Sequence, residues 1–383
     1  MTASATQTSI TPAGGGKHNR LVSLDLLRGL AVAGMILVNE MAGMVSKGPV
    51  YSTLLHSRWD GLTIADVVFP AFLMMMGVSV PLSFGGRNEP AGLGNNQARR
   101  IAWRTVRLIA VGFILSNLWW LSHFSATPWR LFGVLQRIGL VYGACAVLFL
   151  LCAPRTRLLI IAALLVLYWP LSLLPSLDGL PNDIWMRGHN FVGSVDRVLL
   201  GVHNYVKGPE GYDPEGLLGT LPAIAQGLIG VAVGEFLRRG QQTRLRPLAV
   251  AGLAMLLVGG LWSLVFPVVK DIWSSSFVLV TCGITTLLLA GLLAAFDQGQ
   301  PITGWRKAVT ILLLPFGMNA IAAYVLHEVA GSMLGWDLLL APYRQARSIF
   351  VPEVAAFVPV LLFMAFSWAC MDYLRRRNWM IKI

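Results

Sequence analysis

Long apolar stretches alternate with short polar connections along almost the whole chain. A helix that crosses a bilayer needs about 20 mostly apolar residues, so each stretch of this length predicts one span. The pattern predicts about ten spans, at residues 24–45, 62–84, 101–121, 131–153, 157–177, 217–237, 247–267, 276–296, 308–330 and 353–374. With no internal repeat in view, we expect one all-α domain over residues 21–383, a polytopic transmembrane helical bundle.

The start of the chain has a different character. Residues 1–16 are mainly Ser, Thr, Ala and Gly, without the apolar stretch and cleavage site of a secretory signal. We therefore expect residues 1–20 to form a disordered cytoplasmic tail and the first span to be retained.

Lys and Arg gather in alternate connections, which indicates how the bundle is oriented, since short cytoplasmic loops hold these residues in excess. The basic clusters are Lys17 and Arg20; Arg87, Arg99, Arg100, Arg104 and Arg107; Arg155 and Arg157; Arg238, Arg239, Arg244 and Arg246; Arg306 and Lys307; and Arg375, Arg376, Arg377 and Lys382. In a topology of ten spans, all of these basic clusters lie on the same side of the membrane. Both termini are then expected in the cytoplasm, and the acidic loop at about 178–216 is expected outside.

Composition agrees with this class. The chain is 56% hydrophobic and 13% charged, with a mean hydropathy of +0.66, whereas soluble domains carry about 25% charged residues. The net charge of +12 does not indicate nucleic-acid binding, because the basic residues form short clusters between apolar stretches. The four cysteines lie inside apolar segments without the spacing of a metal site, so we expect no metal cofactor.

Ionisable residues inside spans are candidates for function, because each costs at least about 2.5 kcal/mol on insertion scales unless it is paired or wetted. Asp25 and Arg28 are three residues apart and share a face of the first helix. They are either a structural ion pair or an anion site, in which Arg28 binds a phosphate.

A second group lies near the outer surface. Asn39 falls towards the end of the first span, His56 in the next loop and Asp66 at the start of the second span. His56 is either a solvated bystander or a proton acceptor, the role for which histidine is suited near neutral pH.

Further polar residues occur in later spans. Arg137 interrupts the fourth span, where structural pairing and ligand binding are both open. Asn319 and His327 are eight residues apart, near one face of the ninth helix, and Glu328 follows. Such a polar stripe usually faces other helices.

Six segments, in order along the chain, add a resemblance. They are Arg20–Gly29, Val38–Asn39, His56–Pro70, Gly133–Gly139, Asp213–Ile224 and Gly317–Val329. Together they resemble the family of heparan-alpha-glucosaminide N-acetyltransferase, a family of transmembrane acyltransferases. Their agreement in sequence and order is more specific than any single short motif.

The resemblance implies an activity: acetyl transfer from cytoplasmic acetyl-CoA to the amine of a terminal glucosamine on the far side of the membrane. It places the family's catalytic histidine on His56 and its companion asparagine on Asn39. It also implies a homodimer. The short tail and compact chain suggest a bacterial inner-membrane protein, with an envelope or salvaged amino sugar as the acceptor.

This chemistry suits the residues. Amine attack on a thioester needs a base, donors for the developing oxyanion and a site that positions the acyl carbon. We expect His56 to be the base or to carry the acetyl group, Asn39 to donate to the oxyanion, and Asp66 to orient the imidazole. The candidates for binding the CoA moiety are Arg28, Arg104, Arg107, Arg137, Asn319 and His327.

Two other classes of function compete with the enzyme. A transporter of a sugar or other polar solute would also use intramembrane charges and interrupted helices, although transporters often contain internal repeats. A sugar-binding or scaffold protein without catalysis is disfavoured because both His56 and Asn39 are present.

Overall fold

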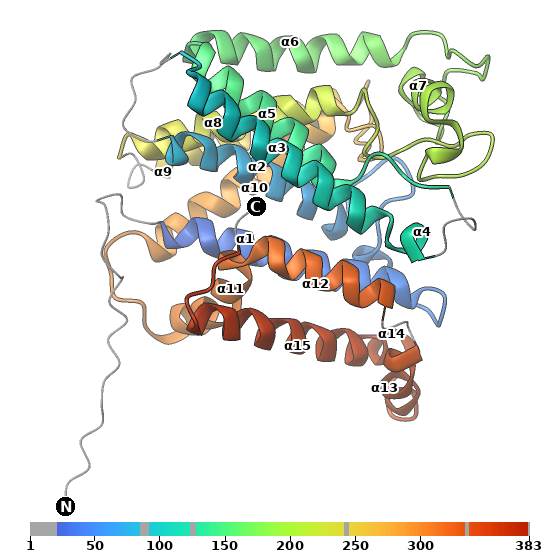
Figure 1. The fold of residues 1–383 in the computed structure, drawn as a ribbon, viewed down its shortest axis with the longest axis vertical. Coiled ribbons are helices and arrows are strands. Elements are labelled where there is room, and N and C mark those ends of the chain that lie inside the picture. The colour runs from blue at the N-terminus through green and yellow to red at the C-terminus, as the bar shows by residue number, and fades with distance from the viewer. Residues whose placement is uncertain (1–20, 85–91, 123–127, 241–244, 334–336, 382–383) are drawn as a thin grey trace, which may run out of the picture.

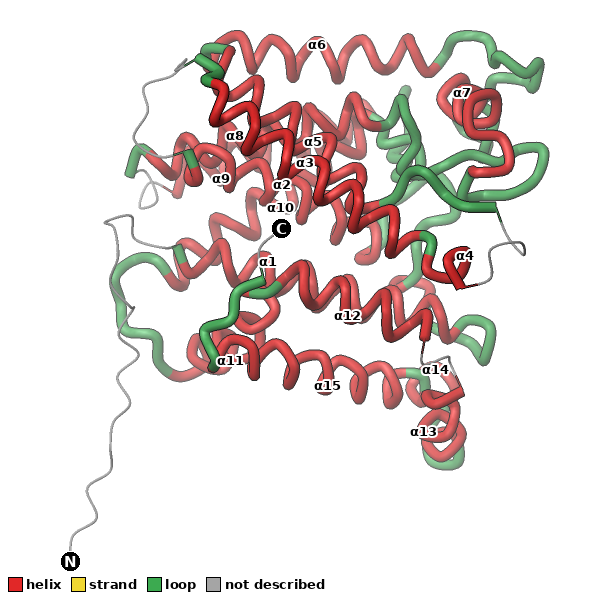
Figure 2. Tube along the Cα trace, in the orientation of Figure 1, coloured by secondary structure: helices red, strands yellow, loops and turns green. Residues whose placement is uncertain are grey.

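The computed structural model describes residues 21–381 except 85–91, 123–127, 241–244 and 334–336. The predicted disorder of residues 1–20 therefore lies outside the described residues. Within them the chain forms helices and loops without any strand (Figure 2). The protein is thus an all-α helical bundle, as expected from the apolar pattern.

The ten predicted spans each coincide with one helix or with two consecutive helices. The long helices are α1 (Val22–Met44), α2 (Ile64–Ser83), α3 (Asn95–Ser116), α5 (Val134–Leu151), α6 (Pro154–Ser172), α8 (Thr220–Arg238), α9 (Leu245–Trp262), α10 (Ser275–Phe296), α11 (Gly304–Met318), α12 (Ala320–Met333) and α15 (Phe357–Arg376). The shorter elements are α4 (Leu118–Ser122), α7 (Phe191–Leu200), α13 (Asp337–Arg347), α14 (Pro352–Ala355) and the 3-10 turns Ser52–Leu54 and Gly201–His203.

Length and apolarity qualify eight of the described helical segments as membrane spans. The pair α11 and α12 adds a ninth, bent by 76° at Asn319. Helix α3, at 22 residues, is long enough to cross a bilayer, but it carries Arg99, Arg100, Arg104 and Arg107 and is too polar to qualify by composition. The protein is a polytopic helical membrane protein.

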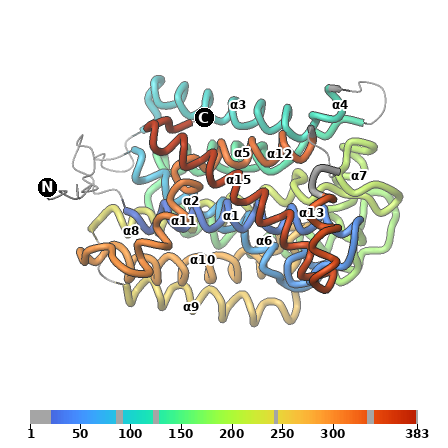
Figure 3. Tube along the Cα trace, turned by 90° about the horizontal axis from the view of Figure 1, so that it is seen from below, coloured from blue at the N-terminus to red at the C-terminus, as the bar shows by residue number. Residues whose placement is uncertain are grey.

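The bundle has two chemically different ends. The acidic loop 178–216, with α7, lies at the same end as α13, and we call this the loop end (Figures 1 and 3). The start of α1 lies at the opposite end, the basic end, with the α5–α6 and α10–α11 connections. The starts of α6 and α11 and the end of α15 lie at this end, and these segments carry Arg155, Arg306 and Arg376. The described basic clusters and the acidic loop therefore lie at opposite ends, as the ten-span topology requires.

The helices pack in two groups with α1 between them (Figure 1). The major group contains α2, α3, α5, α6, α8, α9 and α10, and its core includes Leu73, Val141 and Phe277. The minor group contains α11, α12 and α15, and its core includes Phe316 and Phe363. Because α1 contributes apolar residues to both cores, it joins the two groups.

Helices α2 and α8 approach so closely that their backbones touch. A Cβ on Gly77 would lie 2.0 Å from the carbonyl oxygen of Gly227, and one on Gly230 would lie 2.1 Å from that of Met74. In membranes, where apolar burial gives little drive for helix association, small residues allow close packing of this kind. This contact forms the centre of the major group.

The first helix is capped by a distant residue. Asp297, just beyond α10, accepts hydrogen bonds from the backbone N–H groups of Val22 and Ser23 at 3.0 and 2.9 Å. The carboxylate satisfies two amides at the start of α1 and complements the helix dipole. It thereby ties α1 to the major group at the basic end.

We predict that Gly230→Ala lowers the free energy of unfolding by about 1 to 3 kcal/mol, because its methyl group must push apart two backbones. The matched control is Gly291→Ala in α10, where an added Cβ meets nothing within 4 Å; it should be neutral or stabilise by up to about 1 kcal/mol. Thermal unfolding in detergent compares the two. Equal melting temperatures would show that the α2–α8 contact is not a tight one.

Candidate active site

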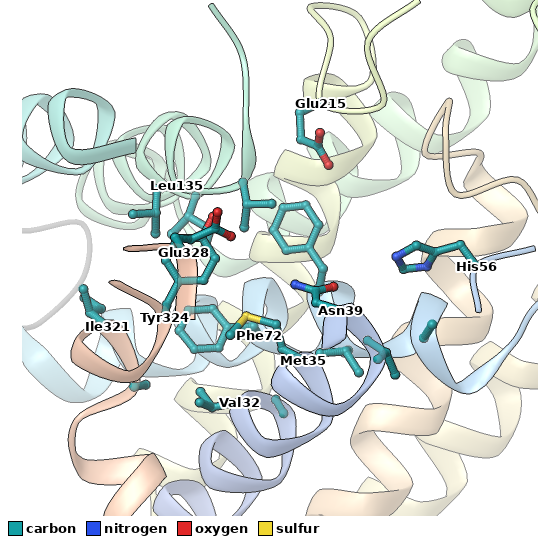
Figure 4. Close-up of a pocket in the computed structure, with 18 of the residues that line it drawn as sticks. Val32, Met35, Asn39, His56, Phe72, Leu135, Glu215, Ile321, Tyr324 and Glu328 are labelled. Atoms are coloured by element: carbon teal, nitrogen blue, oxygen red, sulfur yellow. The ribbon is translucent and has the colours of Figure 1, made fainter. Parts of the chain in front are cut away.

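A cavity lies among α1, α2, α5 and α12 and opens to the exterior, with an empty volume of about 780 Å³ that includes open solvent. Its walls are mainly apolar, with Met35, Phe72 and Leu135 among the lining side chains (Figure 4). The polar lining residues are Asn39, His56, Glu215, Lys270, Tyr324 and Glu328. Since His56, Glu215 and Lys270 come from connections at the loop end, the cavity reaches that end of the bundle.

His56 is held by a buried carboxylate. Its Nδ1 lies 2.8 Å from Oδ1 of Asp66, whose side chain is fully buried, while the His56 side chain is 41% exposed. The other carboxylate oxygen, Oδ2, accepts hydrogen bonds from the backbone N–H groups of Ser57 and Thr63 and from the Thr63 hydroxyl. Both oxygens of Asp66 thus have partners, and Nε2 of His56 is left for the cavity.

Local sequence explains this arrangement. Thr63 and Asp66 form a capping box at the start of α2, in which Asp66 occupies the third helical position. The same carboxylate that caps the helix also reaches back to His56, ten residues earlier. The inference that Asp66 lies beside His56 rested on proximity in sequence, and the structure places the two side chains in contact.

The loop between His56 and α2 is fixed to other loop-end segments. The N–H of Gly61 donates to the carbonyl oxygen of Val268 at 3.0 Å, and Asp60 accepts from the N–H of Val268. Gly61 has a φ of +116°, a backbone conformation that favours glycine. Trp59 adds a hydrogen bond from Nε1 to the carbonyl oxygen of Ile184. These contacts fix the loop that carries His56 to the segments around Val268 and Ile184.

A second histidine–carboxylate pair lies beside the cavity. Nδ1 of His327 is 3.0 Å from Oε1 of Glu40, and Nε2 of His327 is 3.3 Å from Nδ2 of Asn39. Glu40 and His327 are buried, whereas Asn39 lines the cavity. The structure therefore brings His327 into contact with Asn39 and Glu40, which lie almost 290 positions earlier in the sequence.

The segment before α8 brings Glu215 to the cavity. Arg130 donates to both oxygens of Asp213, at 2.9 and 2.6 Å, and to Glu215 at 2.5 Å. Burial alone would raise the pKa of Glu215, but the charge of Arg130, with Arg137 and Lys270 behind it, lowers the pKa below its ordinary value. Glu215 is thus held as an anion at the wall of the cavity.

Asp196 of α7 supports the same segment. Its carboxyl group accepts hydrogen bonds from the N–H groups of Asp213 and Leu217 at 3.3 and 3.2 Å. Burial raises the pKa of Asp196 to about 7, even though these N–H groups favour the charged form. Asp196 therefore fixes the backbone two residues before and two residues after Glu215.

The predicted binders of the CoA moiety lie away from the lining of this cavity. Arg28 pairs with Asp25 at 3.2 Å and donates to Ser79. On α3, the guanidinium of Arg104 lies 4.4 Å from the ring centre of Tyr142. The guanidinium of Arg107 lies over the ring of Trp103 on the same helix.

Arg137 and Asn319 each form a hydrogen bond with the protein backbone. The fully buried Arg137 donates one hydrogen bond, from Nη2 to the carbonyl oxygen of Gly216 at 3.0 Å, and its guanidinium lies 4.8 Å from the Trp273 ring centre. Its Nε and Nη1 have no hydrogen-bond partner among the described residues. Asn319, at the bend between α11 and α12, accepts from the N–H of Ile381.

Several cavity residues were not predicted as site residues. Tyr324 and Glu328 are four residues apart on α12 and hydrogen-bonded to each other, a spacing that could have indicated a pair. Arg130 has no such signal, because its partner Asp213 is 83 residues away. Lys270 and Glu215 likewise meet at the cavity only through the packing of the loop end.

The chain matches known proteins over most of its length. The family model described as heparan-alpha-glucosaminide N-acetyltransferase, catalytic, covers residues 20–271. The chain is 31% identical to heparan-alpha-glucosaminide N-acetyltransferase of Homo sapiens in an alignment of 363 positions that covers 81% of this chain and 53% of the human protein. It is 28% identical to the Mus musculus protein of the same name in an alignment of 391 positions that covers 88% of this chain and 58% of the mouse protein.

The chain thus spans a little over half the length of these two relatives. The residues matched by the family model include Asn39 on α1, His56 in the following loop and Asp66 on α2. They also include α5, α8 and the segment with Glu215 that precedes α8. The chain belongs to the heparan-alpha-glucosaminide N-acetyltransferase family.

Proposed function

We propose that this protein transfers the acetyl group of acetyl-CoA to the amine of a glucosamine-type sugar. The observation that carries the proposal is the His56–Asp66 pair at the wall of the cavity. The ring of His56 points into the cavity towards Asn39 (Figure 4). The names of the human and mouse relatives, both N-acetyltransferases, support the same activity.

His56 acts as the general base. Asp66 accepts a hydrogen bond from the Nδ1–H of His56, so Nε2 carries a lone pair towards the cavity. The amine nitrogen attacks the acetyl carbonyl carbon, a C–N bond forms, and Nε2 takes a proton from the amine. The C–S bond then breaks, and the departing CoA thiolate receives this proton from His56. Asp66 stabilises the imidazolium that forms between the two steps.

We propose that acetyl-CoA enters from the basic end and that this end faces the cytoplasm. The described arginine clusters gather there, and short cytoplasmic loops are rich in Lys and Arg. The lining residues Ala31, Val32, Met35 and Asn39 follow α1 towards the loop end. Arg28 lies one turn nearer the basic end, and the rise from Arg28 to Asn39 is about 16 Å. The nucleotide would therefore bind near Arg28, with the thioester extended towards His56.

Location and assembly complete the proposal. We place the protein in a bacterial inner membrane as a homodimer, with the acceptor on the outer side at the loop end. The acidic residues Glu215 and Glu328 in the cavity wall suit an acceptor that carries an amine. Light scattering of the detergent-solubilised protein measures the oligomeric state.

A transporter remains the second candidate function because of one observation, the bend of 76° between α11 and α12. Interrupted helices of this kind often form the binding sites of transporters. Binding of acetyl-CoA at micromolar concentration, followed by release of free CoA only when glucosamine is present, identifies the enzyme. Glucosamine flux into proteoliposomes without acetylation identifies the transporter.

We predict that His56→Ala reduces acetyl transfer by about 10²- to 10⁴-fold, the usual contribution of a positioned general base, while acetyl-CoA binding is retained. The control is His189→Ala, because His189 also pairs with a carboxylate, that of Glu210, but does not line the cavity. Transfer to glucosamine and the Kd for acetyl-CoA are measured for both. Near-normal transfer by His56→Ala would remove His56 from the mechanism.

We predict that Asp66→Asn reduces kcat by about 10²-fold or more, because an amide in this position can donate to Nδ1 and so places the proton on Nε2, the wrong nitrogen for a base. Acetyl-CoA affinity should change little. If kcat stays within twofold of the parent value and the variant is folded, the orienting role of Asp66 is wrong.

We predict that Arg28→Gln raises the Kd for acetyl-CoA by about 10- to 100-fold through the loss of a charged hydrogen bond to phosphate. S-acetylpantetheine, which lacks the nucleotide, should bind the parent and the variant equally. Arg246→Gln, an exposed arginine on α9, is the matched control and should bind acetyl-CoA normally. An unchanged Kd in Arg28→Gln, as in the control, would exclude Arg28 from the nucleotide site.

A further inference from the structure

The orientation of the Asn39 amide is fixed by two residues that stand behind it. Glu40, the next residue on α1, is 2% exposed, and His327 on α12 is 8% exposed. A carboxylate can only accept hydrogen bonds, so Nδ1 of His327 donates to Oε1 of Glu40 over 3.0 Å. This contact places the imidazole proton of neutral His327 on Nδ1.

The second nitrogen of His327 is then an acceptor. Nε2 lies 3.3 Å from Nδ2 of Asn39 and receives one of its N–H bonds. The opposite orientation of the amide would set the Asn39 oxygen against the lone pair of Nε2. The amide oxygen of Asn39 is therefore turned away from His327, and Figure 4 shows it on the side that faces His56.

The same reasoning applies to His56, whose Nδ1 is held by Asp66. Two hydrogen-bond acceptors, Oδ1 of Asn39 and Nε2 of His56, therefore face one region of the cavity. The group that complements two acceptors is one with two N–H bonds. A primary amine held by both of them directs its lone pair away from Asn39 and His56, free to attack an acyl carbon.

We propose that Asn39 binds the acceptor amine through its carbonyl oxygen, and that His327 and Glu40 are positioning residues which hold the amide in this orientation. The inference rests on the proposed function. It reverses the interpretation drawn from the sequence, in which Asn39 donates to the oxyanion. In the reaction, the amine N–H bond that faces His56 loses its proton to Nε2, and the one that faces Asn39 stays intact in the amide product.

The polarity of Asn39 is tested by comparing Asn39→Asp with Asn39→Leu. An Asp side chain still offers an acceptor oxygen to the amine, and a proton on Nε2 of His327 restores the contact behind it. We expect kcat/KM for glucosamine to stay within about tenfold of the parent for Asn39→Asp and to fall about 100-fold for Asn39→Leu. Should Asn39→Asp fold, bind acetyl-CoA and yet be as slow as Asn39→Leu, Asn39 is a donor and the inference is overturned.

The positioning role is tested at His327. His327→Leu and Glu40→Gln should raise KM for glucosamine by about tenfold, with the Kd for acetyl-CoA unchanged. His327→Gln should recover much of this loss, because a glutamine amide can donate to Glu40 and accept from Asn39. A purely structural role would instead lower the melting temperature without a selective change in KM for the amine, and that result contradicts the inference.

The two proposals fail in different ways. A parent protein that binds acetyl-CoA but acetylates no amine overturns the proposed function, and the amine-binding role of Asn39 with it. An active parent in which His327→Leu leaves KM for glucosamine unchanged overturns the positioning role alone.

Discussion

The buried carboxylate of Asp66 is the interaction on which the rest of the site depends. A carboxylate with no access to water must have its oxygens satisfied by the protein, because an uncompensated buried charge is strongly destabilising. Asp66 meets this requirement with the amides of Ser57 and Thr63, the Thr63 hydroxyl and the His56 ring. One side chain therefore starts α2, closes the preceding loop and sets the histidine tautomer.

The same requirement organises the other polar residues of the bundle. Near the basic end, Arg157 forms a buried pair with Glu235. Near the loop end, Arg130 satisfies Asp213 and Glu215, and Asp196 accepts hydrogen bonds from the amides of Asp213 and Leu217. Polar contacts near the loop end thus surround an otherwise apolar cavity. Such a setting strengthens hydrogen bonds within the cavity, because little water competes for them.

Much of the fold follows from the sequence, but less of the site does. Apolar length located all ten helical segments, since a bilayer imposes one scale on every span. Contacts between residues within one turn or one loop could also be predicted from the sequence, such as the contact between His56 and Asp66. The contact of Asn39 with His327 was not, because it joins residues on α1 and α12, and only the packing of the minor group on α1 brings them together. The bend at Asn319 was likewise hidden, since the apolar pattern continues through it.

The division of the bundle into two helix groups has a mechanical consequence. The base and its carboxylate stand on the α1–α2 loop and on α2, in contact with the major group, whereas the histidine that orients Asn39 stands on α12 of the minor group. The cavity lies between the two groups, and α1 packs against both of them. A small rotation of the minor group would therefore move His327 relative to Asn39 and Glu40 on α1, while His56 kept its contact with Asp66. Alignment of the amine with the base is thus a property of how the two groups sit together.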